Sequence, residues 1–175
     1  MQSEHIRLPS KANGRRNIMA LPGVSTVGIT FGYGVETTAG EKPATFTQLT
    51  RINTIAGLDI TNENIDASAL EDTLTKYIKG RGDIGGGEWS YTLNLTPETV
   101  TETETMMTAA ATAYAAGKST WYEIIIPGFT QAIFVVAQPG SEIPVPEMNQ
   151  NELLTVDIPL TVNDYKGFDT KVNFT

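Results

Sequence analysis

The chain has 175 residues, and its 20 Asp and Glu outnumber its 12 Lys and Arg, giving a formal net charge of −8. This length suits one domain with a sizeable core, and the acidic balance disfavours nucleic acid as a bound ligand, because phosphate contacts rely on Lys and Arg. The absence of Cys excludes disulfides and thiolate chemistry, and a single histidine, His5, excludes a Ser-His-Asp triad or a multi-histidine metal site in one chain. We therefore expect no cofactor. No stretch approaches the ~18 apolar residues that a membrane helix needs, so we also expect no membrane insertion.

The chain begins with a leader of 22 residues, whose first 16 are polar and basic ahead of an otherwise acidic body. Such a leader either lacks fixed structure in an isolated chain or is an arm that becomes ordered against an acidic neighbouring subunit. No domain linker follows it, so we expect an N-terminal arm in residues 1–22 and a single β domain in residues 23–175. The basic side chains of the leader are Arg7, Lys11, Arg15 and Arg16.

The alternation over residues 27–37 predicts the first β-strand. Its apolar face includes Phe31, whereas Gly32 and Gly34 leave the opposite face almost bare. Glycines in that pattern suit a close approach of another backbone. After a hairpin connection, residues 45–55 are expected to form the return strand.

Residues 59–87 form a long polar excursion between strands, which is typical of a segment that contacts a partner. A calcium loop is disfavoured, because the turn glycine is missing at the sixth position and the bidentate glutamate at the twelfth. We interpret the excursion as an internal arm: a solvated acidic loop with one helical turn at residues 67–70, then a flexible glycine-rich segment at residues 80–87. Its charged side chains include Asp59, Glu63, Asp66, Glu71, Asp72, Lys76, Lys79 and Arg81.

Residues 88–95 alternate cleanly and predict a strand with one buried and one solvated face. Trp89, Tyr91 and Leu93 occupy the apolar face, while Glu88, Ser90, Thr92 and Asn94 occupy the polar face.

A helix is expected to follow, with Thr96 as its N-cap, Pro97 at its first position and Gly117 at its end. We expect this helix to be amphipathic and to cover a sheet. The residues expected on its packing face are Val100, Met107, Ala111 and Tyr114.

The last third of the chain predicts three more β elements. Residues 120–127 and 130–138 form a hairpin around Gly128, and residues 153–162 form the last long strand, beyond a proline-broken loop. A polar tail at residues 163–175 could add an edge strand or an arm. The sum is a mainly β fold, a β-sandwich or partial barrel of about seven or eight strands with one packed α-helix.

This order of elements resembles the major tail tube proteins of long-tailed bacteriophages. The resemblance covers residues 24–162, and its specificity lies in the ordered combination, since no single motif is a fingerprint. It rests on Phe-Gly-Tyr-Gly-Val-Glu-Thr-Thr at 31–38, Phe-Thr-Gln-Leu-Thr-Arg-Ile at 46–52, the acidic arm at 64–72 and the hinge at 76–85.

The resemblance implies a structural virion protein whose hexameric rings stack into a hollow tail tube that conducts DNA. It implies further copies of the chain and the tail tip, tail terminator and tape measure proteins as partners, DNA that passes without specific binding, and assembly in the host cytoplasm. Alternation marks the residues expected to face the lumen: Glu88, Ser90, Thr92, Asn94, Thr155, Asp157 and Thr161. The charged residues of the leader and of the internal arm, named above, are the candidates for contacts between subunits and rings.

Three alternatives remain open. A ring or tube protein of a contractile tail or secretion system would share the fold. A β-sandwich binding module would expose an aromatic cluster, whereas Trp89 and Tyr91 are expected in the core; Trp121 and Tyr122 are ambiguous. An enzyme would have only a carboxylate mechanism available, and no pair of acids stands out, so we expect no catalytic activity.

Overall fold

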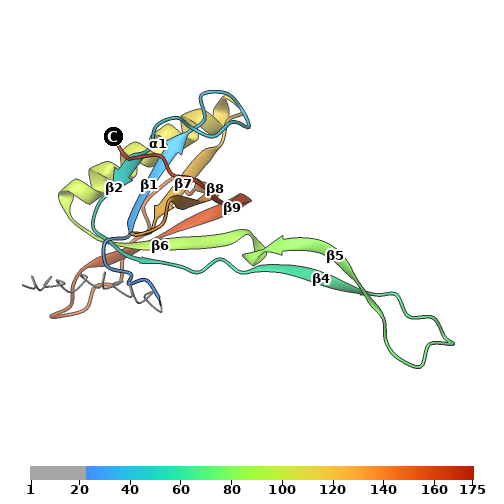
Figure 1. The fold of residues 1–175 in the computed structure, drawn as a ribbon. Helices are drawn as coiled ribbons and strands as arrows, with labels where there is room; N and C mark the ends of the chain where they lie inside the picture. The colour runs from blue at the N-terminus through green and yellow to red at the C-terminus, as the bar shows by residue number, and fades with distance from the viewer. Residues whose placement is uncertain (1–22) are drawn as a thin grey trace, which may run out of the picture.

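The computed structural model describes residues 23–175, so the four basic residues of the leader lie outside the described part. This part holds nine strands, one α-helix and one 3-10 turn (Figure 1). The elements are β1 (Thr30–Val35), β2 (Thr47–Leu49), β3 (Ile52–Ile55), β4 (Ile60–Asp66), β5 (Tyr77–Ile84), η1 (Gly85–Gly87), β6 (Glu88–Asn94), α1 (Pro97–Ala115), β7 (Thr120–Ile125), β8 (Gln131–Pro139) and β9 (Thr155–Thr170).

Seven strands form one antiparallel sheet in the order β2-β1-β7-β8-β9-β6-β3, and β4 and β5 form a separate two-stranded hairpin. The large sheet is strongly curled, because Phe31 of β1 contacts both Trp89 and Tyr91 of β6 although three strands separate β1 from β6. The expected mainly β fold with a single packed helix is confirmed. The sheet is a partial barrel with two remaining edges, β2 and β3.

Helix α1 packs on the concave face of this sheet. Thr96 caps it as expected, since its side chain accepts a hydrogen bond from the Thr99 backbone N–H and Pro97 begins the helix. Met106 and Met107 join the main core, and the Tyr122 hydroxyl donates to the Met106 Sδ at 3.2 Å. Residues 23–175 contain no helix with the length and apolar character needed to cross a membrane.

The expected packing face of α1 is partly wrong. Met107 is buried, but Ala111 and Tyr114 are exposed. The helix instead buries two threonines, whose hydroxyls bond to backbone carbonyls: Thr103 donates to the Thr99 carbonyl at 2.7 Å, and Thr99 donates to the Asn94 carbonyl at 2.9 Å. These internal bonds let polar residues occupy the core side of a helix.

The convex face of the sheet is covered over β7 and β8 by the end of the chain. Val172 and Phe174 pack against a second cluster formed by Phe46, Trp121, Ala132, Phe134 and Val136. The buried Glu123 carboxylate accepts a hydrogen bond from the Val172 N–H at 2.7 Å, and Lys42 pairs with Asp169 at 2.6 Å. The polar tail is thus not a free arm: residues 163–170 continue β9 along β8, and the last residues cover a second core.

The expected return strand at residues 45–55 is wrong as a single element. β2 pairs with β1, whereas β3 pairs with β6 at the opposite edge of the sheet. The turn between them places Arg51 at φ 53°, a left-handed conformation that is uncommon for a residue with a side chain. Two short strands separated by one sharp turn therefore join the two edges of the curled sheet.

Gly32 and Gly34 have the predicted role of permitting close approach. A Cβ on Gly32 would lie 2.5 Å from the Thr47 carbonyl oxygen, and one on Gly34 would lie 2.8 Å from the Thr45 carbonyl oxygen. The same Cβ on Gly32 would lie 2.4 Å from a carbon atom of the Phe174 ring. The bare glycine face is thus the contact surface for the start of β2 and for the chain terminus.

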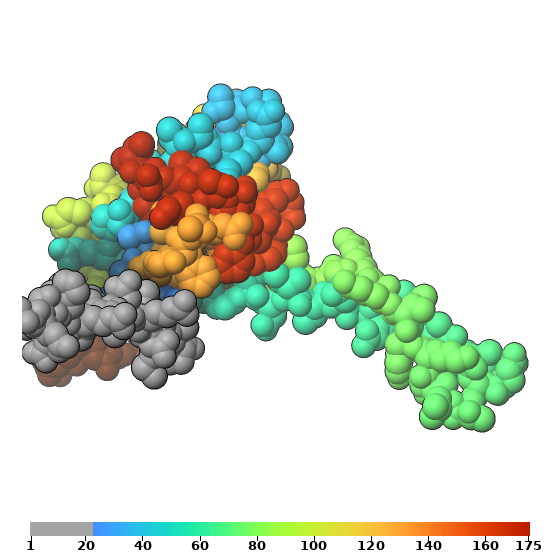
Figure 2. Space-filling view, viewed as in Figure 1, coloured from blue at the N-terminus to red at the C-terminus, as the bar shows by residue number. Residues whose placement is uncertain are grey.

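The expected acidic loop with a helical turn is also wrong. Residues 60–66 form strand β4, residues 67–70 contain no helix, and the glycine-rich stretch lies mostly in β5. The β4–β5 hairpin projects away from the body as a narrow extension (Figures 1 and 2). We call residues 59–84 the arm.

Candidate functional site

The seven residues expected to face a lumen all lie on the convex side of the β6–β9 pair. Their neighbours in sequence, such as Trp89, Tyr91 and Ile158, are buried in the core. The antiparallel register sets them across from one another: Glu88 with Thr161, Thr92 with Asp157 and Asn94 with Thr155. We call these seven residues the polar face.

Two residues that the alternation argument missed share this surface. Pro159 lies opposite Ser90 in the β6–β9 register, and Thr54 of β3 lies opposite Thr92. Pro159 was omitted because it is not polar, and Thr54 because β3 was expected to belong to another strand. Both positions follow the same period of two, so the alternation itself was the signal that could have found them.

The polar face is acidic and without positive charge. Its ionisable groups are Glu88 and Asp157, and no Lys or Arg occurs in β3, in β6 or in residues 155–162 of β9. Asp157 accepts a hydrogen bond from the Thr92 hydroxyl at 3.1 Å. A shallow depression crosses the surface beside Ser90 and Asp157 and is bordered by Ala56 and Gly140. The face is therefore built to be wetted and to repel anions.

The arm holds all eight charged residues that were expected to contact neighbouring subunits outside the leader. Every residue of β4 is exposed, and β5 is exposed except at Gly80 and Ile84, which are half-buried. At the tip, Asp72 pairs with Lys76 four residues later and accepts the Ala69 N–H at 2.9 Å. The Lys76 hydrogen bond lowers the pKa of Asp72, with the Ala69 N–H as the second cause.

Large apolar side chains on the arm have no cover among the described residues. Leu70 and Leu74 at the tip are 107% and 79% exposed, and Tyr77 and Ile78 at the start of β5 are 63% and 56% exposed. Sequence reasoning missed both leucines, since it assigned Leu70 to a helical turn and gave Leu74 no role. A two-stranded hairpin is marginally stable alone in water, so this arm is expected to gain stability from a partner.

Three glycines set the direction in which the arm leaves the body. Gly85, Gly86 and Gly87 have φ values of 52°, 66° and 81°, which side chains rarely adopt. They separate β5 from β6 and end the pairing of the large sheet, so the chain turns out of the sheet at this point. The arm and the polar face are consequently joined through η1.

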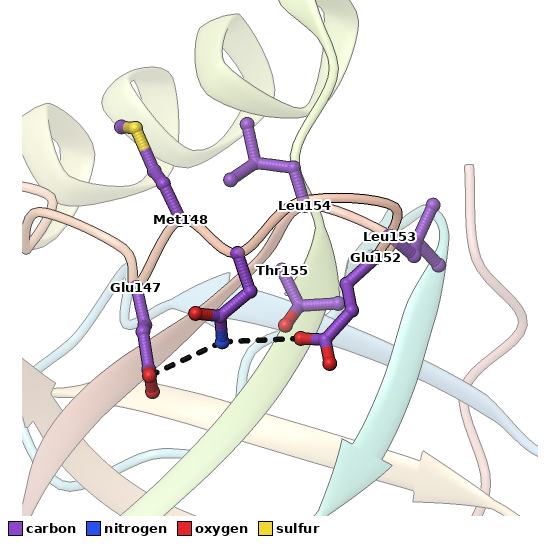
Figure 3. Close-up of a pocket in the computed structure, with 7 residues that line it drawn as sticks. Glu147, Met148, Glu152, Leu153, Leu154 and Thr155 are labelled. Atoms are coloured by element: carbon purple, nitrogen blue, oxygen red, sulfur yellow. Dashed lines mark hydrogen bonds between the residues drawn. The ribbon is translucent and has the colours of Figure 1, made fainter.

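The loop before β9 forms the pocket drawn in Figure 3. The Asn149 side-chain amide donates to Glu147 at 3.2 Å and to Glu152 at 3.1 Å. The lining residues include no aromatic side chain, and within residues 23–175 no group of three His, Cys, Asp or Glu could hold a metal ion. Trp89, Trp121 and Tyr122 are all buried, so none of them supplies the exposed aromatic cluster expected of a β-sandwich binding module. A smaller aromatic pair does lie on the surface, where Phe129 and Phe168 stack with their ring centroids 6.1 Å apart.

Comparisons with known proteins identify the fold. No family model matches the sequence, and no curated protein sequence matches it. A chain of the six-fold symmetrised cryo-EM structure of the anti-feeding prophage baseplate superimposes with a TM-score of 0.52 at 12% identity, covering 85% of this chain and 96% of that one. A chain of the native gene transfer agent virion gives a TM-score of 0.46 at 12% identity, covering 72% of this chain and 88% of that one.

The likeness to the baseplate chain establishes that this protein has a fold that also occurs in the anti-feeding prophage baseplate.

Proposed function

We propose that the protein is a structural, non-enzymatic subunit of a phage-type tail, which forms hexameric rings that stack into a hollow tube. The observation that carries this proposal is the presence of an acidic, cation-free polar face and of a projecting arm with uncovered apolar side chains on a tail-type fold. The polar face lines the lumen, and the arm contacts a subunit of the adjacent ring.

The physical properties of each surface support its role. A lumen that carries Glu88 and Asp157 without Lys or Arg repels phosphate, so DNA passes without binding. Contact with another subunit covers Leu70 and Leu74, which removes apolar surface from water. The rings meet tail tip, tail terminator and tape measure proteins in the virion, and the subunits assemble in the host cytoplasm.

A tube subunit of a contractile particle is a second form of the same proposal. The likeness to a chain of a six-fold symmetrised baseplate supports both forms equally, since both require six-fold rings. In both forms the protein builds the same kind of tube, and only the proteins that surround the tube differ.

The first test is negative-stain electron microscopy of the purified full chain before and after concentration. Rings or hollow tubes of uniform width are expected. Dispersed single molecules at all concentrations, with no assembly after tail-tip components are added, would contradict the proposal.

The second test locates the lumen by thiol labelling, which the absence of native cysteine allows. Ser90→Cys on the polar face and Thr112→Cys on the exposed side of α1 form a matched pair. In assembled tubes we expect a small maleimide to label both, and a maleimide attached to a large protein to label only Thr112→Cys. Equal labelling of both by the large reagent would place the polar face on the outside.

A further inference from the structure

A groove runs between the first turns of α1 and the β2 edge of the large sheet. Tyr33 and Leu49, which are 8% and 3% exposed, form its floor, and Gln48, Glu98, Glu102 and Thr105 are among the residues that border it. The groove lies on a different part of the body from the polar face and is separate from the arm. Neither role proposed above uses it.

The β2 side of the groove is an open sheet edge. β2 ends the strand order and pairs only with β1, through Leu49, Gln48 and Thr47. The outward backbone groups of such an edge can bond to an extended segment of another chain. At the two ends of this edge the Thr50 N–H is already bonded to Glu102 and the Phe46 carbonyl already accepts from Thr175, so the main-chain groups left for such a segment lie between them, at Gln48.

The α1 side of the groove is negatively charged. Glu102 is held at the rim, because both the Thr50 N–H and the Thr50 hydroxyl donate to its carboxylate, at 3.1 and 2.9 Å. Hydrogen bonds from its own N–H and from Thr96 lower the pKa of Glu98, as Arg51 does to a lesser degree. The groove therefore suits a segment that is both apolar and basic.

The leader has that composition. Residues 1–22 contain four of the twelve Lys and Arg but one of the twenty Asp and Glu, and they also contain Ile6, Leu8 and Ile18. Residues 23–175 are left with 8 basic and 19 acidic side chains. Bodies of that charge repel one another in an assembly, and a basic segment passed between them offsets the repulsion.

The route of the chain favours a second copy over the same molecule. Residues 23–29 approach β1 beside β3 and the β7–β8 turn: Thr26 and Ile29 lie near Ile52–Ile55, and Gly28 lies near Pro127. β1 lies between β2 and β7 in the sheet, so the groove beside β2 is on the other side of β1 from the β7–β8 turn. A leader of 22 residues spans up to ~70 Å when extended, enough to reach a neighbouring molecule.

We propose that the leader of a second copy of this chain docks in the α1–β2 groove. Its apolar residues cover Tyr33 and Leu49, and its basic side chains lie beside Glu98 and Glu102. The inference rests on the proposed assembly into rings and tubes, and it adds a specific contact to that assembly.

Disulfide cross-linking in the otherwise cysteine-free full chain tests the contact. Leader variants Arg7→Cys, Ser10→Cys, Asn13→Cys and Asn17→Cys are each mixed with a separate chain that carries Thr47→Cys, on the same side of β2 as Leu49, and the mixture is assembled and oxidised. We expect at least one mixed pair to give roughly tenfold more heterodimer than the same leader variant with Thr112→Cys, because docking raises the local thiol concentration.

A charge exchange gives an independent readout. Reversal of all four basic leader residues to Glu is expected to reduce assembly, and adding Glu98→Lys, Thr101→Lys and Thr105→Lys at the groove is expected to restore it. Glu104→Lys, Thr108→Lys and Thr112→Lys on the same helix form the matched control, which should not restore assembly.

The outcomes separate this inference from the proposed function. Tubes that form without any cross-link to Thr47→Cys would overturn the groove contact and leave the tube intact. Cross-links only within one chain, or cross-links from the arm variant Ser68→Cys instead of the leader, would overturn it as well. Groove cross-links between molecules that form no ring or tube would support the contact and count against the tube.

Discussion

The Phe31 and Tyr91 rings lie 5.0 Å apart between centroids, although β1 and β6 are not neighbours in the sheet. Phe31 also stacks on Tyr122 of β7 at 5.6 Å. This aromatic group holds the two halves of the curled sheet together and so places the polar face on the outside of the curve. The geometry of the proposed lumen surface therefore depends on core residues that never face it.

Replacement of Tyr91 by Ala is expected to reduce the free energy of unfolding by about 3–5 kcal/mol, because a fully buried ring is lost and a cavity remains. Tyr91→Phe is the matched control. The Tyr91 hydroxyl is buried with no hydrogen-bond partner among the described residues, so its removal should change stability by less than about 1 kcal/mol or raise it. Urea denaturation of both variants measures this, and an equal loss in both would contradict the packing argument.

Glu36 should make the protein sensitive to acid. Burial alone would raise the pKa of Glu36, but hydrogen bonds from Trp121, Ser119 and Gly40 together lower it below its ordinary value of 4.5. The carboxylate therefore stabilises the fold above the unfolded-state pKa, and this contribution is lost as the pH falls through the lowered folded-state pKa.

Glu36→Gln should cost about 1–3 kcal/mol at pH 7 and should remove this part of the acid dependence. Denaturation midpoints from pH 7 down to pH 3 measure both effects. An unchanged slope in the variant would show that other groups cause the acid sensitivity.

Glu123 should act in the opposite direction. Burial raises the pKa of Glu123, against the Val172 hydrogen bond and the nearby Lys42 and Lys171. Its contribution is present below the unfolded-state pKa of about 4.5 and is lost as the pH rises through the raised folded-state pKa. Glu123→Gln keeps an acceptor for the Val172 N–H and carries no charge at any pH. Relative to the parent protein, we expect the variant to have a free energy of unfolding about 1 kcal/mol higher at pH 7 and little changed at pH 4. Destabilisation at pH 7 would contradict this assignment.

Leu70→Ser with Leu74→Ser should separate assembly from folding. Both leucines are exposed in the single chain, so thermal unfolding should change by less than about 0.5 kcal/mol. The variant should nevertheless fail to form tubes, because the contact of the arm is lost. Val145→Ser in the loop before β9, where the side chain is 89% exposed, is the control and should assemble normally. Normal tubes from the double variant would remove the arm tip from the proposed interface.

Gly32→Ala tests the close approach of β2 and the chain terminus. The added Cβ would collide with the Thr47 carbonyl and the Phe174 ring, so we expect a loss of about 1–3 kcal/mol in the free energy of unfolding. Gly57→Ala is the control, since its Cβ meets nothing within 4 Å, and it should fall within about 0.5 kcal/mol of the parent. Similar stabilities for the two variants would contradict the contact.

Local pattern was enough to predict the elements that have one buried and one wet face. The alternation in β6 and in residues 155–162 identified both the core residues and the polar face, because a period of two places every second side chain on the same side. The start of α1 was equally predictable, because its signals are local. The Thr96 side chain accepts a hydrogen bond from a first-turn N–H, and Pro97 has no N–H that would need a partner.

Only the tertiary structure decided features that depend on pairing between distant segments. The stretch at residues 45–55 divides between the two edges of the sheet, and β4 and β5 are strands because they pair with each other, although neither buries a face. The helix buries Thr99 and Thr103 because the curled sheet reaches around it, which no helical period in the sequence indicates. Local sequence patterns indicate which side of a helix or strand is buried. Which strands pair, which strands become sheet edges and which surfaces stay exposed depend on contacts between residues that are far apart in the sequence.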